Sequence, residues 1–136
     1  MPPRYFTPEE ANAALEEVRP AAERMVERTR ALEAARARQA DLAAHISGNG
    51  GAIAPADIAE AQAAVEREAH GVAECIERLQ ELGCQVKDLE TGLLDFPALH
   101  EGRQVLLCWR VDEEAVEHWH GPEDGFSGRR PLPFDE

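Results

Sequence analysis

The chain has 136 residues and a mass of 15.0 kDa, which suits one domain rather than two. Its 27 acidic and 14 basic residues give a formal net charge of −13, which disfavours the basic surface that nucleic acids and anionic membranes attract. The longest apolar run, residues 105–109, is too short to cross a bilayer, and the N-terminus lacks the apolar core of a signal peptide. We therefore expect a single cytoplasmic domain, residues 1–136, that binds neither nucleic acid nor membranes.

Residues 7–83 have the pattern of a long antiparallel helical hairpin with a turn near 48–54. Thr7 and Glu10 can cap the start of the first helix reciprocally. Pro20 lies inside this helix and predicts either a kink or a split. Pro55 marks the start of the second helix. Apolar or small residues follow the alternating three- and four-residue spacing of a coiled coil at Leu15, Val18, Ala22, Met25, Thr29 and Leu32.

The seam of this hairpin is rich in alanine, which limits the apolar area that two helices alone can bury. The backbone entropy lost on ordering is nearly the same for every residue. The hairpin therefore needs another layer, which either the C-terminal unit or a second copy of the chain must supply. The sequence predicts a homodimer through the hairpin, with a further protein partner as a possibility.

Residues 84–136 have the pattern of a small sheet unit with a short helix and an irregular tail. Segments 84–88, 93–97 and 105–109 predict a three-stranded antiparallel meander, in which Pro97 ends the second strand. Asp112 is placed to cap a short helix that runs to Trp119 or His120. The fold class is therefore α+β.

The second half also carries a resemblance to a known family. The run of residues 87–97, KDLETGLLDFP, is its core, and the sequences LCW at 107–109, WH at 119–120 and GFSGRRP at 125–131 complete it together with Glu113. The opening segment 5–12, YFTPEEAN, agrees as well. Together they resemble the small bacterial family known as domain of unknown function 2203. This family has no established activity, so the resemblance implies a fold and no catalytic or binding residue.

Three residues of this block are candidate ligands of a divalent metal ion. Glu113 and His120 are seven residues apart and would share one face of the predicted helix. Asp95, on a neighbouring strand, could be the third ligand. The structural alternative is that Glu113 and His120 each stabilise one end of the helix dipole.

A second candidate is a small-ligand site with aromatic walls and a few polar groups. Asp95 is flanked by apolar residues, so it requires a partner such as Lys87, and a cross-strand ion pair between the two is the structural alternative. The adjacent arginines could hold a carboxylate or phosphate, or could pair with the acidic body of the protein. The candidate ligand-binding residues are Lys87, Asp95, Trp109, Trp119, Arg129 and Arg130.

No catalytic motif for a nucleophile, a nucleotide or a metalloprotease centre is present, so the sequence leaves enzymatic activity open and slightly disfavours it. The three cysteines match no metal-binding spacing and are interpreted as reduced, buried thiols. Two functions follow. The first is a small dimeric interaction or scaffold protein. The alternative is a small-ligand or metal-binding protein, with or without enzymatic activity, whose site lies within residues 87–130.

Overall fold

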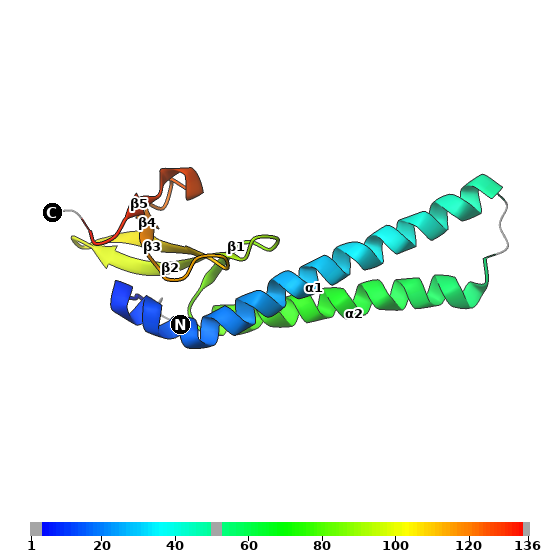
Figure 1. The fold of residues 1–136 in the computed structure, drawn as a ribbon, viewed down its shortest axis with the longest axis horizontal. Coiled ribbons are helices and arrows are strands. Elements are labelled where there is room, and N and C mark those ends of the chain that lie inside the picture. The colour runs from blue at the N-terminus through cyan, green and yellow to red at the C-terminus, as the bar shows by residue number, and fades with distance from the viewer. Residues whose placement is uncertain (1–3, 50–52, 135–136) are drawn as a thin grey trace.

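The computed structural model describes residues 4–49 and 53–134, and its class is α+β, as predicted. The helices α1 (Pro8–Asn49) and α2 (Pro55–Glu81) form the expected hairpin, and an antiparallel sheet follows (Figure 1). Part of the predicted turn, residues 50–52, lies outside the described residues. The strands are β1 (Gln85–Asp88), β2 (Leu93–His100), β3 (Arg103–Arg110), β4 (His118–His120) and β5 (Arg130–Pro131), and a 3-10 turn, η1 (Phe126–Gly128), precedes β5.

The start of α1 is capped as predicted. The amide of Glu10 donates to Oγ1 of Thr7 at 3.0 Å, and the amide of Thr7 donates to Oε1 of Glu10 at 2.9 Å. Pro20 lies inside a continuous α1, so the helix is not split. Figure 1 shows a bend in its blue N-terminal part, which agrees with the kink that an internal proline produces.

The first turns of α1 lie beyond the end of α2 and cover one face of the sheet (Figure 1). The ring of Phe6 meets the ring of Phe96 edge-on, with 5.2 Å between centroids. This arrangement places the main core between α1 and the sheet. The buried side chains there include Phe6, Ala11, Leu15, Val18, Leu94, Phe96, Leu107 and Trp109.

The sheet has five strands in the order β1-β2-β3-β4-β5, so the prediction of three was wrong. The predicted helix from Asp112 to His120 is also absent: strand β4 occurs in this region instead, and the turn η1 follows it along the chain. A helix would need the carbonyl of Glu113 to accept from the amide of Glu117. In the structure that carbonyl accepts from Nε1 of Trp109 at 3.0 Å and from Nη1 of Arg19 at 3.1 Å. These side-chain donors compete with the helix, and the segment pairs with the free edge of β3.

The prediction that the second strand ends at Pro97 was wrong, because β2 continues to His100. The carbonyl of Pro97 accepts from the amide of Phe6 at 2.7 Å, on the side away from β3. The nitrogen and carbonyl of one strand residue face the same side, so the missing N–H of Pro97 also faces away from β3. The pairing of Pro97 with Leu106 therefore loses no hydrogen bond.

The two faces of the sheet differ in chemistry. The face toward α1 is apolar, whereas the opposite face carries Asp95, Cys108 and His120. Figure 1 shows the segment that contains η1 on the side of the sheet away from α1. Among the described residues, no helix combines the length and the apolar character needed to span a membrane.

Candidate functional site

Three chemically active side chains meet on the sheet face away from α1. Asp95 on β2 pairs directly with Cys108 on β3. His120 on β4 lies diagonal to Cys108, because the register pairs His118 with Cys108 and Leu106 with His120. Asp95, Cys108 and His120 are 1%, 0% and 3% exposed. The three strands thus bring together, out of solvent, an acid, a thiol and an imidazole, here called the Asp95–Cys108–His120 group.

The contact between Asp95 and His120 requires a proton between them. Nδ1 of His120 lies 2.7 Å from the carbonyl oxygen of Gly121, so this nitrogen carries a hydrogen and donates it. Nε2 of the same ring lies 3.1 Å from Oδ1 of Asp95. An unprotonated Nε2 facing a carboxylate would leave two acceptors in contact. The pair therefore holds a proton between its atoms and is electrically neutral as a unit.

Cys108 completes the group. Its Sγ, an oxygen of Asp95 and a ring nitrogen of His120 all lie within 4.8 Å of one another. Burial, and then the negative charge of Asp95, raise the pKa of the Cys108 thiol to about 12. The nearby Arg129 opposes this shift only in part. The thiol is therefore protonated at neutral pH, and it is a poor nucleophile in this state.

Glu113 belongs to a neighbouring cluster. Nη2 of Arg129 donates to its Oε1 at 2.7 Å, and the amide of Arg110 donates to the same oxygen at 2.8 Å. Nδ1 of His118 lies 3.0 Å from Nη2 of Arg129. Of the three metal ligands predicted from the sequence, Asp95 and His120 are in contact, whereas Glu113 is held by Arg129. The loss of the predicted helix causes this, because Glu113 and His120 no longer share a helix face.

The candidate ligand-binding residues lie on different faces and do not form one pocket. Lys87 is exposed at an irregularity in β1, and the register places Gln85, rather than Lys87, opposite Asp95. Trp109 is buried in the core beneath the sheet. Trp119 and Arg130 line an open pocket, with the guanidinium carbon of Arg130 5.2 Å from the centroid of the Trp119 ring.

Sequence reasoning treated Cys108 as an inert thiol and so missed its place beside Asp95. The run of residues 105–109, which contains Cys108, is apolar throughout, so its sequence gives no sign that the two faces differ. The signal is the register of β2 on β3, which pairs Asp95 with Cys108 across a short turn. In the sequence, turn residues indicate only where each strand ends. They do not show which residue of β2 lies opposite which residue of β3.

Fold and site together define an α+β protein with an N-terminal helical hairpin and a buried Asp–Cys–His group in its sheet. The chain belongs to the family described as "Uncharacterized conserved protein (DUF2203)", whose model matches residues 4–132. The comparisons with curated proteins and with solved structures give no match. The resemblance seen in the sequence is thereby confirmed, and function has to be argued from the geometry.

Proposed function

We propose that this protein binds one divalent transition-metal ion of the zinc type through Asp95, Cys108 and His120. The observation that carries the proposal is the meeting of an oxygen, a sulfur and a nitrogen donor within 4.8 Å, all of them buried. Carboxylate, thiolate and imidazole are the three ligand types that zinc takes in proteins. Three protein ligands leave a fourth position, which is typical of catalytic rather than structural zinc sites.

The separation of Asp95 and His120 suits such an ion. Zinc bonds of about 2.0–2.3 Å in tetrahedral geometry separate the ligand atoms by roughly 3.3–3.8 Å. The 3.1 Å contact between Asp95 and His120 would open only slightly to admit the ion. The hydrogen bond from Nδ1 of His120 to the carbonyl of Gly121 fixes the tautomer that leaves Nε2 free to bind metal. Metal-binding histidines are commonly oriented in this way.

The charge of the group favours a divalent ion. A carboxylate, a thiolate and a neutral imidazole carry two negative charges, which a divalent ion neutralises. Without metal, the proton shared by Asp95 and His120 and the proton on Cys108 achieve the same neutrality. Since an unbalanced charge is costly in a buried site, the exchange of these protons for one divalent ion keeps the interior neutral.

Cobalt is the most informative probe, because Co²⁺ replaces zinc and reports thiolate ligation as a charge-transfer absorption. We expect this absorption to saturate at one Co²⁺ per chain and to be absent in Cys108→Ser. Cys84→Ser is the matched control, since Cys84 is another buried thiol outside the group. Circular dichroism establishes that both variants are folded. Metal binding at this group would be refuted if the wild type developed no absorption band. It would also be refuted if Cys84→Ser lost the band to the same extent as Cys108→Ser.

A second candidate function, an interaction protein that dimerises through its hairpin, is supported by the far end of the hairpin. None of the α1 side chains from 33 to 45 is buried, and Ile58 on α2 is 42% exposed. A second copy of the chain is the partner we propose, because two such hairpins can cover each other as a four-helix arrangement. A test of this dimer needs a residue that is exposed in the single chain. Leu32 in the predicted seam does not qualify, because it is buried and a charge there would disturb the single chain as well as a dimer.

Sedimentation equilibrium of Ile58→Glu tests this second candidate. We expect a dimer for the wild type and a monomer for the variant, because a buried unpaired carboxylate disfavours association. Ala63→Glu adds the same charge at an exposed position on another side of α2 and should remain dimeric. A monomeric wild type would exclude the dimer.

A further inference from the structure

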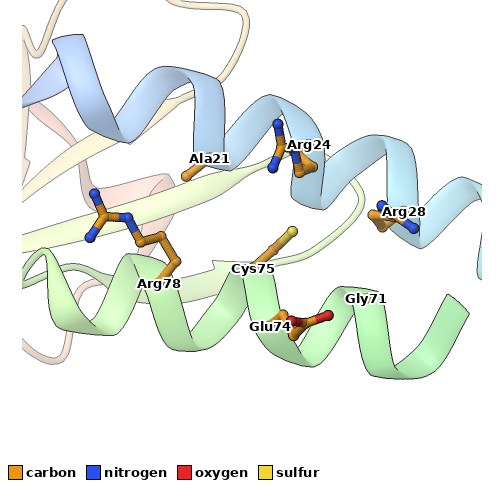
Figure 2. A pocket seen from close by; sticks show the side chains of 7 residues that line it. All are labelled: Ala21, Arg24, Arg28, Gly71, Glu74, Cys75 and Arg78. Atoms are coloured by element: carbon orange, nitrogen blue, oxygen red, sulfur yellow. The ribbon is translucent and has the colours of Figure 1, made fainter. Parts of the chain in front are cut away.

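A hollow separate from the Asp95–Cys108–His120 group lies between α1 and α2. Its volume is about 160 Å³. Figure 2 shows Arg24 and Arg28 on α1 and Arg78, Cys75 and Glu74 on α2, with the Cys75 sulfur directed toward α1 and the Arg78 guanidinium directed away from Arg28. The hollow thus combines three guanidinium groups with one carboxylate, in a chain whose net charge is −13.

These arginines are only partly neutralised by acidic neighbours. Nη1 of Arg28 lies 3.5 Å from Oε1 of Glu68, and Nη1 of Arg78 lies 4.0 Å from Oε2 of Glu81. Both guanidinium side chains are about half exposed, at 46% and 53%, so these pairs are weak. Within the described part of the chain, Arg24 has no hydrogen bond or ion pair. Donor capacity therefore remains available at the hollow.

Gly71 gives Arg28 its place at this hollow. A Cβ at residue 71 would lie 3.2 Å from both Cδ and Nη1 of Arg28, which is closer than side chains normally pack. Glycine in the interior of a helix makes that helix less stable than alanine does. The absence of a side chain at this buried position lets Arg28 lie across α2 and bring its guanidinium to the lining of the hollow.

We propose that this hollow binds a small oxyanion of the phosphate type. Guanidinium groups donate paired hydrogen bonds to the oxygens of phosphate, and groups from two helices can approach one anion from different sides. Sites for drug-sized ligands occupy roughly 300–1,000 Å³, so a hollow of about 160 Å³ suits a single compact anion. The overall negative charge repels anions at long range, so recognition depends on these arginines at short range.

Titration with inorganic phosphate, followed by NMR at the amides of Gly71 and Cys75, tests the proposal. We expect saturable shifts below about 10 mM phosphate at constant ionic strength. Arg24→Gln should weaken binding at least tenfold, and Gly71→Ala should also weaken it by displacing Arg28. Arg36→Gln makes the same charge change at an exposed position of α1 outside the hollow, so it should bind like the wild type.

Three results would overturn the proposal. The first is the absence of saturable shifts in the wild type, and the second is equal weakening by Arg24→Gln and Arg36→Gln. The third is equal binding of acetate and phosphate, which would show attraction of any anion. Because the titration contains no metal, its outcome is independent of the cobalt experiment at the sheet.

Discussion

Oδ1 of Asp95 and Nε2 of His120 lie 3.1 Å apart between two side chains that are almost completely buried. Strand β3 separates the two residues in the sheet, and Cys108 on that strand lies beside both. The apolar core is on the other face of the sheet, so this buried polar pair is separate from the main core.

Removal of one partner should be costly. Asp95→Ala leaves the buried imidazole of His120 without its acceptor, and loss of one member of a buried ion pair typically destabilises by about 3–5 kcal/mol. Urea unfolding at neutral pH measures the effect. Asp112→Ala is the control, because it removes an exposed carboxylate that pairs with Arg110 at 2.6 Å and should change the stability little. A small effect of Asp95→Ala would contradict the buried contact.

Glu113 should be dispensable for metal binding. Glu113→Gln keeps the shape of the side chain but removes the charge that pairs with Arg129, so we expect lower stability. Zinc affinity, measured by competition with a chromophoric chelator, should stay within about threefold of the wild type, because Glu113 lies outside the Asp95–Cys108–His120 group. A loss of about a hundredfold would make Glu113 a ligand, as the sequence pattern predicted.

Cys84 should make the protein less stable at alkaline pH. Burial raises the pKa of its thiol from the ordinary value of 9.0 to about 12. Between these values the unfolded chain releases the proton and the folded chain retains it, so stability falls as pH rises, by up to about 1.4 kcal/mol per pH unit. Urea unfolding from about pH 8 to about pH 11 should show a shallower fall for Cys84→Ala. Parallel curves for the two proteins would contradict the shift.

Gly92 should tolerate substitution less well than Gly102. Both have positive φ, at 68° and 77°, so alanine is strained at either position by about 1–2 kcal/mol. A Cβ on Gly92 would also lie 2.5 Å from Cγ2 of Val111, whereas one on Gly102 would meet nothing within 4 Å. Thermal unfolding should show that Gly92→Ala is destabilised more than Gly102→Ala, by about 1–3 kcal/mol. Equal losses of stability in the two variants would contradict the close approach of Val111 to Gly92.

The helices were predictable because their signals are local. Thr7 and Glu10 lie three residues apart, and the apolar or small residues of the seam from Leu15 to Leu32 follow one another every three or four residues. The continuity of α1 through Pro20 was not predictable, because packing against the sheet and α2 offsets the lost hydrogen bond.

The C-terminal strands were less predictable because they depend on distant partners. Residues 112–120 have a helical sequence pattern, yet Arg19, ninety-four residues from Glu113, donates to the Glu113 carbonyl. Likewise, the sequence predicts Asp95 and His120 as two of three metal ligands, but it places His120 on a helix rather than on a strand. Their contact, and the part of Cys108 in it, follow from strand register, which the sequence alone leaves open.

A native mass spectrum of the folded protein, taken after incubation with Zn²⁺ and removal of the excess, tests metal binding most directly. The account predicts one zinc ion on each wild-type chain and none on His120→Gln, with charge-state distributions that show both proteins to be folded. Metal-free wild type, or His120→Gln loaded to the same extent as the wild type, would contradict a metal centre at Asp95, Cys108 and His120.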